Sequence, residues 1–299
     1  MPLLFIALIV FGSVGVAYVV FLVAVAALSV YPPRIPPFFS PAQTGAPQES
    51  VWFTTEDGVE LSGWWVEGGT NTVLVCLHGF LANKSEFAPY ADRLVRLGCS
   101  VLFVDFRCHG GSQRSKCTFG TEEAKDVRAA VAYSRQRAPG ARIVLMGSSM
   151  GGAASVRAMA DDPDLADALI ADGPYANLDV AARGFWHVTG LRPLATLMSP
   201  AASFGRLFLG HNTKDVDLLE HFRKLAGKQV LLLFGDSDKV VPKDSAQNCV
   251  DASQSKVEWF SGCGHCQGRF AEPYRYFNSI ANFLTDSSLL PNSPDNRPE

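Results

Sequence analysis

Charged side chains are scarce in this sequence. Asp, Glu, Lys and Arg make up 18% of its 299 residues, below the roughly 25% of an average soluble domain. The 29 acidic and 26 basic side chains nearly cancel to a formal net charge of −3, and no block of like charge stands out. The charge balance therefore gives no reason to expect a nucleic-acid partner.

The shortage of charge is greatest at the N-terminus, where residues 3–31 contain no charged side chain. A helix of about 20 apolar residues spans the hydrocarbon core of a bilayer. A cleavable signal peptide has a basic start and a shorter apolar region of roughly 7–15 residues, whereas the first basic residue here is Arg34. We therefore expect a single-pass membrane anchor over 3–31. Ala24-Val25-Ala26 resembles a cleavage site, and Arg34 alone does not decide the orientation.

The sequence also lacks the cysteine pattern of a disulfide-rich secreted domain. Its seven cysteines are an odd number spread along the chain, so they do not form a disulfide framework. Cys263 and Cys266 form a Cys-x-x-Cys pair around His265. A zinc site needs a second pair of ligands at suitable spacing, and a redox pair opens a helix in a thioredoxin-like unit. Neither context is visible, so zinc or redox chemistry at this pair is only weakly indicated.

Proline separates the apolar segment from the rest of the chain. Five prolines lie between Tyr31 and Pro41. Because proline removes backbone donors and resists helix formation, residues 32–50 are predicted to form a semi-rigid linker. A single domain is expected over 51–285. Residues 286–299 are polar and carry three prolines, which is typical of a flexible tail.

Apolar runs recur at regular intervals within the predicted domain. The first two, VWFTT and LSGWWV, flank an Asp57-Gly58 pair that is typical of a hairpin turn. The later runs are continuously apolar, as expected of parallel strands buried on both faces. Alternation of such strands with helices predicts a doubly wound α/β fold. These strands lie at 72–78, 100–106, 142–148, 166–172, 229–236 and 256–260, and the clearest helices at 84–97, 121–137 and 274–284.

One segment interrupts this alternation. Residues 175–223 are rich in apolar side chains, Gly and Pro, and they show no strand pattern. The segment is too long for a plain loop in a compact domain. We expect a small helical insertion between two core strands.

The most informative short motif is GSSMG, residues 147–151, which lies between a predicted strand and a predicted helix. This is the context of a nucleophile elbow, in which a serine stands exposed on a sharp turn. Gly147 and Gly151 would allow the close approach of neighbouring backbone that such a turn requires. A small-residue crossing between strand and helix would produce the same pattern, so the motif alone does not decide.

Three further sites follow predicted strands. The stretch LHGF at 77–80 could supply a backbone N–H for a developing oxyanion, or it could be an ordinary turn. LLLFGDSD at 231–238 carries Asp236 and Asp238, either of which could orient a histidine. A glycine-rich loop over 260–270 carries His265.

Taken together, these motifs resemble the α/β-hydrolase superfamily of serine hydrolases, whose catalytic residues occur in the chain order Ser, Asp, His. The similarity extends over about residues 51–285. It is nearest to membrane-anchored enzymes that resemble monoacylglycerol lipases, protein depalmitoylases and serine aminopeptidases. The stretch DFRCHGGS, residues 105–112, is similar to the family's D-x-R-G-x-G-x-S loop, with Cys108 in place of a glycine.

The resemblance implies a role for each motif. It makes Ser149 the nucleophile and His265 the general base and acid. It selects Asp238 rather than Asp236, because Gly235, Asp238, Val241 and Pro242 match the family pattern at this loop. It makes the backbone N–H groups of Phe80 and Met150 the oxyanion donors, and it makes 175–223 a lid.

The implied function is hydrolysis of an ester or thioester of an acyl substrate without a cofactor, and a lipid at the membrane is one candidate substrate. A serine peptidase of the same fold is the alternative, and Asp217 and Glu220 are candidates to hold a substrate amine. A non-catalytic membrane scaffold is the third hypothesis, because a fold alone does not establish activity. His109 and His187 are secondary candidates, with structural or pocket-lining roles.

Overall fold

The computed structural model describes the chain except residues 1, 70, 189–195, 199, 210–215 and 291–299. Within the described part, eight strands form one sheet in the order β1-β2-β4-β3-β5-β6-β7-β8. β1 and β2 pair antiparallel, as do β2 and β4, and the other pairs are parallel. The strands are β1 (Glu49–Thr54), β2 (Glu60–Val66), β3 (Thr72–Leu77), β4 (Ser100–Val104), β5 (Arg142–Ser148), β6 (Ala168–Asp172), β7 (Val230–Gly235) and β8 (Lys256–Phe260).

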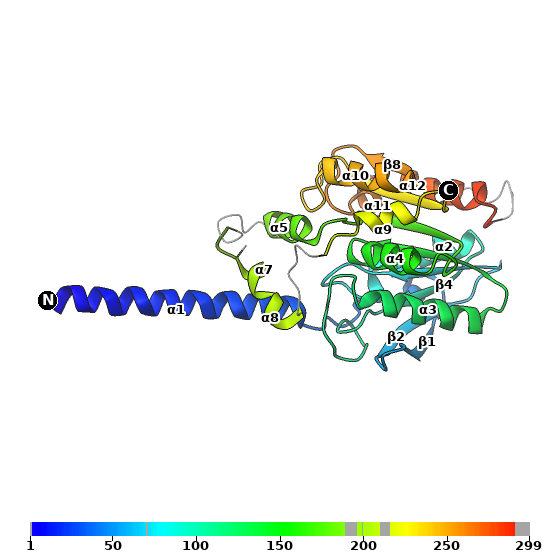
Figure 1. Cartoon of the computed structure of the whole chain (residues 1–299). Coiled ribbons are helices and arrows are strands. Elements are labelled where there is room, and N and C mark those ends of the chain that lie inside the picture. The colour runs from blue at the N-terminus through cyan, green and yellow to red at the C-terminus, as the bar shows by residue number, and fades with distance from the viewer. Residues whose placement is uncertain (1, 70, 189–195, 199, 210–215, 291–299) are drawn as a thin grey trace.

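Helices cover both faces of the sheet, so the predicted doubly wound α/β architecture is confirmed (Figure 1). Alternate residues of β3 belong to opposite cores, with Val75 on one side and Cys76 on the other, because successive side chains of a strand point to opposite faces. One face carries α3 (Glu123–Arg137), α4 (Met150–Asp161), α9 (Leu219–Lys224) and α10 (Lys243–Ser253), and the other carries α2 (Ala91–Arg96) and α12 (Pro273–Asp286).

The N-terminal segment forms one long helix, α1 (Pro2–Val30). Its length and apolar composition are sufficient to cross a membrane. Figure 1 shows α1 projecting from the domain, with its N-terminus far from the sheet. Its C-terminal end lies beside the segment between β6 and β7, which contains α5 (Leu178–Val188), α7 (Ala201–Phe204) and α8 (Arg206–Leu209).

A few residues on either side of 51–285 also pack against the core of the domain. The proline-rich stretch contains a 3-10 helix, η1 (Pro41–Thr44), and Ala46 is buried against the core. At the other end, Leu289 and Leu290 are buried in the same core, so packed residues extend past 285. The remainder of the expected tail, 291–299, lies outside the described residues.

The prediction of a single helix over 84–97 is wrong. The chain instead forms the 3-10 turns η2 (Lys84–Glu86) and η3 (Ala88–Tyr90), followed by the short α2. Pro89 explains the difference, because proline lacks a backbone donor and disfavours helical backbone in the residue before it. Apolar side chains of this segment, including Phe87 and Leu94, are nevertheless buried in the core.

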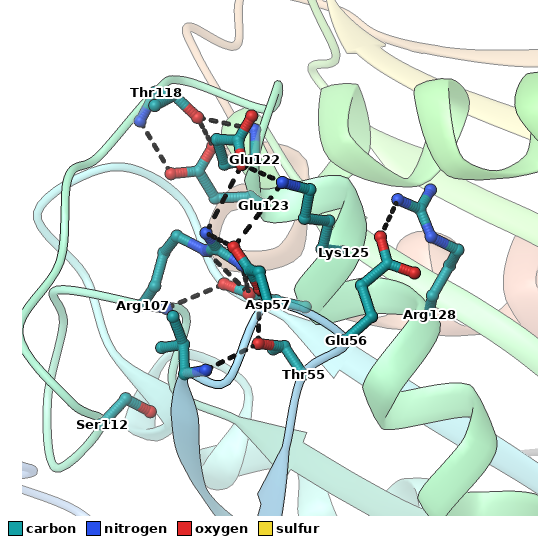
Figure 2. Close-up of polar contacts among 12 residues, drawn as sticks. Thr55, Glu56, Asp57, Arg107, Ser112, Thr118, Glu122, Glu123, Lys125 and Arg128 are labelled. Carbon is teal, nitrogen blue, oxygen red and sulfur yellow. Dashed lines mark hydrogen bonds and ion pairs between the residues drawn. The ribbon is translucent and has the colours of Figure 1, made fainter. Parts of the chain in front are cut away.

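An ion-pair cluster holds the DFRCHGGS loop against the first hairpin and α3 (Figure 2). The buried Arg107 guanidinium contacts Asp57 at 2.9 Å and Asp126 at 2.7 Å. The hydrogen bond from Arg107, opposed by burial, lowers the pKa of Asp57. Cys108, at the family's glycine position, has a left-handed φ of 66°, so the loop keeps the turn without its usual residue.

Replacing Arg107 should destabilise the protein far more than replacing a nearby exposed arginine. Arg107→Ala leaves the buried Asp126 carboxylate without its partner, which lowers the free energy of unfolding by about 3–5 kcal/mol. The control Arg128→Ala removes a pair with the exposed Glu56 (Figure 2), for which at most about 1 kcal/mol is expected. Denaturant unfolding of the detergent-solubilised chain measures both; equal losses would contradict this view of the cluster.

Candidate active site

Ser149 lies at the junction of β5 and α4 in a strained backbone conformation. Its φ is 47° and its ψ is −107°, a region that costs a non-glycine residue about 1–3 kcal/mol. The Ser149 N–H donates to the carbonyl of Asp172 at 2.7 Å, which ties the turn to the end of β6. This is the sharp strand-to-helix turn that the motif indicates.

The two glycines of the motif are required by backbone contacts. A Cβ at Gly147 would lie 2.4 Å from the carbonyl carbon of Gly151, and a Cβ at Gly151 would lie 2.2 Å from the carbonyl oxygen of Leu77. Both distances are far too short for a side chain. The start of α4 can therefore pass over β5 and β3 only with glycine at these positions.

His265 connects Ser149 to Asp238 through its two ring nitrogens. Nε2 lies 2.8 Å from the Ser149 hydroxyl oxygen, and Nδ1 lies 2.7 Å from Asp238 Oδ2. An ionised carboxylate can only accept hydrogen bonds, so Nδ1 carries the proton and Nε2 accepts from Ser149. The other Asp238 oxygen accepts from the backbone N–H groups of Val240 and Val241 at 2.7 and 3.0 Å.

Asp238 and Asp236 have different surroundings. Asp236 is only partly buried, and its carboxylate accepts from the N–H of Gly262 at 2.7 Å and from Ser237. It therefore connects the loop that follows β7 to the loop that follows β8, whereas the side chain of Asp238 is fully buried behind His265. Of the two candidate acids, only Asp238 contacts the histidine.

The surroundings of His265 favour its protonated form. Burial opposes the charge, but the adjacent Cys266 sulfur and the Asp238 carboxylate outweigh burial and hold the pKa of His265 well above its usual range. Burial also raises the pKa of the Cys266 thiol. The Asp238 carboxylate accepts the hydrogen bond from Nδ1 and so stabilises a proton on His265.

The two predicted N–H donors belong to residues beside Ser149. Met150 begins α4, so its N–H lies at the positive end of a helix dipole. Phe80 follows β3 and lines the same pocket as Ser149 and Met150. Buried His78 shapes this turn, because its Nε2 accepts from the N–H of Phe106 at 3.0 Å and its Nδ1 lies 2.7 Å from the carbonyl of Gly79.

A buried charge network beneath these residues was not predicted. Glu86 accepts from the N–H of Gly79 at 2.7 Å and forms an ion pair with Arg269. Arg269 also contacts Asp172 at 3.4 Å, the residue whose carbonyl accepts from Ser149. Burial disfavours the charge of Glu86, but Arg269 and the Gly79 N–H hold its pKa below the usual value.

This network joins three loops that carry the candidate site. Glu86 contacts the loop that precedes Phe80, Asp172 contacts the serine turn, and Arg269 follows the His265 loop. Single acidic and basic residues far apart in the sequence give no sign that they meet. The one feature of the sequence that points to this network is that Glu86 lies close to the LHGF motif along the chain.

A largely apolar pocket lies at Ser149. Its empty volume is about 800 Å³, which includes space open to solvent. Its walls come from the Phe80 and Phe119 loops, α5, α7, α8, the start of α4 and the C-terminal turns of α1. Among the described lining residues, none carries a charged side chain. The segment expected to be a lid therefore contributes to the pocket, although 189–195 and 210–215 lie outside the described residues.

The secondary candidates have other surroundings. His109 is buried, and its Nδ1 bonds to the carbonyl of Arg107; burial lowers its pKa to about 3. The side chain of His187 lies outside the described residues. Glu220 pairs with Arg223 on the surface, and Asp217 accepts from the N–H of Leu219. Neither carboxylate lines the pocket.

The cysteines of the chain are not paired in disulfides. Cys263 and Cys266 are buried free thiols, as are the other five cysteines. Cys266 accepts from Ser148 at 3.4 Å and donates to the carbonyl of Asp172 at 3.3 Å. No described group of three or more His, Cys, Asp or Glu side chains is arranged to hold a metal ion.

Removing the charge of Glu86 should slow chemistry at Ser149 without unfolding the protein. Glu86→Gln keeps the side-chain shape but weakens the bond that fixes Gly79 and hence Phe80. We expect the labelling rate of Ser149 by a fluorophosphonate to fall about 10–100-fold, less than the roughly 100–1000-fold expected for complete loss of one oxyanion donor. Glu56→Gln, on the surface, is the control. An unchanged rate in folded Glu86→Gln would show that the network does not position the loop.

The chain is similar in sequence to proteins from distant organisms. An uncharacterized protein of Mycobacterium tuberculosis is 26% identical over 268 residues, which cover 87% of this chain and 88% of that protein. A monoglyceride lipase homolog of monkeypox virus is 29% identical over 180 residues, which cover 56% of this chain and 64% of that protein.

A comparison with solved structures and a comparison with protein families lead to the same classification. The esterase Pf2001 of Pyrococcus furiosus superposes with a TM-score of 0.74 at 27% identity, over 86% of this chain and 98% of that one. The family described as serine aminopeptidase, S33, matches residues 69–224, just over half of the chain. The resemblance predicted from the motifs is thereby confirmed: the chain belongs to the serine aminopeptidase S33 family and has the α/β-hydrolase fold.

Proposed function

We propose that this protein is a serine hydrolase that cleaves carboxylic ester or thioester bonds of acyl substrates. The observation that carries the proposal is the continuous chain of hydrogen bonds from Ser149 through His265 to Asp238, at 2.8 and 2.7 Å. Ser149, at one end of this series of hydrogen bonds, lines a largely apolar pocket. Such a series is the arrangement by which a weakly acidic hydroxyl becomes a nucleophile.

In the proposed reaction, Ser149 Oγ attacks the carbonyl carbon while His265 Nε2 takes the hydroxyl proton. The negative charge that develops on the carbonyl oxygen is stabilised by the N–H groups of Phe80 and Met150. His265 then protonates the leaving alcohol or thiol, and the acyl group remains on Ser149. Water, deprotonated by His265, attacks this acyl-enzyme and releases the acid. Asp238 stabilises the imidazolium in both steps.

The pocket supports an acyl substrate more than a peptide with a free amine. A substrate ammonium needs an anionic partner when it is buried, and none of the described lining residues is charged. Two of the similar proteins, one named an esterase and one named a monoglyceride lipase homolog, support the same choice. The family description favours the second candidate, an aminopeptidase.

We further propose that residues 3–31 are a single-pass membrane anchor, followed by a linker over 32–50 and a hydrolase domain that begins near 51. The support is that α1 is apolar throughout and that most of its side chains are exposed. A soluble protein rarely exposes a continuous apolar surface of this size. A non-catalytic scaffold would keep the anchor but would not need the hydrogen-bonded serine.

Ser149→Ala tests the enzyme. We expect the full-length wild-type chain in detergent to react with a fluorophosphonate and to hydrolyse p-nitrophenyl esters. The Ser149→Ala variant should not be labelled, and its kcat should be about 10⁶-fold lower than that of wild type. Ser148→Ala is the matched control and should still be labelled, because its hydroxyl does not contact His265. Equal labelling of wild type and Ser149→Ala would refute the proposal, and unreactive, folded wild type would support the scaffold.

The same preparation separates an esterase from a peptidase. We expect p-nitrophenyl butyrate to be cleaved with a higher kcat/KM than aminoacyl p-nitroanilides, because the pocket offers no partner for an amine. A clear preference for the aminoacyl amide would make the aminopeptidase the correct function.

Asp238→Asn should change both the rate and its pH dependence. Loss of the carboxylate that fixes the histidine tautomer is expected to lower kcat by about 10⁴-fold. Hydrolysis requires neutral His265, so the rate rises as pH increases through the pKa of this residue. Asp238 holds that pKa above the usual 6.5, so the acidic limb of the residual activity should move to lower pH in Asp238→Asn. An unshifted limb would contradict the electrostatic role.

A further inference from the structure

The C-terminal turns of α1 are fixed to the domain by packing and hydrogen bonds. Leu22 and Val25 are buried against Met198 and Ala201 of the segment between β6 and β7. The Tyr18 hydroxyl donates to the carbonyl of Leu197 at 2.7 Å. These contacts give the end of α1 a defined position over the domain (Figure 1).

Backbone and aromatic contacts continue this attachment past the end of the helix. The N–H of Cys117 donates to the carbonyl of Val30 at 2.8 Å. The rings of Tyr31 and Phe208 meet edge to face, with centroids 6.5 Å apart. The last turn of α1 is therefore held both by the loop that leads to Phe119 and by α8.

These same turns form part of the pocket that contains Ser149. Val25, Ala26, Ser29 and Val30 line it, and residues spaced by four positions share one face of a helix. Ser149, Met150 and Phe80 line the same pocket. A molecule that fills the pocket therefore contacts both the proposed nucleophile and α1.

The hydroxyl groups along the pocket are already used within the protein. Ser29 donates to the carbonyl of Val25 at 2.9 Å, and Tyr175 donates to the carbonyl of Phe119 at 2.7 Å. The other walls are mainly Ala, Val, Leu and Phe side chains. A hydrocarbon chain loses no hydrogen bond on entering such a space, whereas a polar chain would.

The exposed part of α1 has the length of a bilayer core. Residues 3–21 are mostly exposed, and at about 1.5 Å per residue they extend about 28 Å, close to the roughly 30 Å of hydrocarbon. Burial begins at Leu22, so the pocket lies just beyond the end of this span. Leu197 and Leu207, on the adjoining segment, are 48% and 70% exposed, as expected of side chains at a membrane surface.

We propose that residues 25–30 of α1 are a wall of the acyl-binding site, and that this site takes long acyl chains of membrane-resident esters directly from the bilayer. The proposal rests on the hydrolase function proposed above and assigns its substrate class. In this proposal the membrane helix helps to determine which acyl chains bind, in addition to anchoring the protein. Cleavage after Ala26 would remove Val25 and Ala26 from this wall, so the proposal requires a catalytic form that retains α1.

The test places a large side chain in this wall. Ala26→Trp, and the milder Ala26→Leu, are prepared as full-length chains in phosphatidylcholine nanodiscs. kcat/KM is measured with p-nitrophenyl acetate, octanoate and palmitate. Because each buried methylene contributes appreciably to binding, Ala26→Trp should lower kcat/KM for palmitate at least about tenfold and Ala26→Leu by less, with acetate changed less than about twofold. Val14→Trp, at a position exposed on the same helix, should match wild type.

Labelling by a small fluorophosphonate shows that the site is intact in each variant. A loss confined to long chains supports the proposal. Unchanged palmitate hydrolysis in labelled Ala26→Trp would overturn it and leave the hydrolase function standing, as would an equal loss for acetate and palmitate. Absence of both labelling and hydrolysis in wild type would instead refute the hydrolase function itself.

Discussion

The structure of the candidate site depends on one backbone crossing, at which the start of α4 passes over β5 and β3. The crossing holds Ser149 at a φ of 47° and leaves no room for a side chain at Gly147 or Gly151. Residues with positive φ are unfavourable outside glycine, so the surrounding packing must impose this conformation. The hydrogen bond from Ser149 to the Asp172 carbonyl and the parallel pairing of β5 with its neighbours supply that constraint.

Charge organises the loops that meet at this crossing. Glu86, Arg269 and Asp172 form a buried network whose members come from three different segments. A buried charge is costly without a partner, so these loops are stable only in an arrangement that keeps the three groups together. That requirement brings the Gly79 turn, the serine turn and the histidine loop into one place, while Arg107 performs a similar function for the loop behind them.

The sequence predicts the parts of the site that follow strands. Ser149, Asp238 and His265 each come directly after a strand, and the carboxyl ends of parallel strands share one edge of the sheet, so their meeting follows from topology. Sequence spacing does not reveal side chains that meet from distant loops, and Glu86 with Arg269 is such a case. Pro89 interrupts the helix that the sequence predicts over 84–97. The contribution of α1 to the pocket also depends on long-range packing, because its uniform apolarity indicates a membrane span and no preferred face.

The proposed function and the proposed acyl-binding site together predict a path from the bilayer along α1 to Ser149. The most direct measurement uses a long-chain alkyl fluorophosphonate with a diazirine at the far end of its chain. The full-length protein in nanodiscs is labelled, irradiated and mapped by peptide mass spectrometry. The account predicts phosphonylation of Ser149 and cross-links to residues 25–30 of α1. Phosphonylation at another residue, or cross-links that never involve α1, would contradict it.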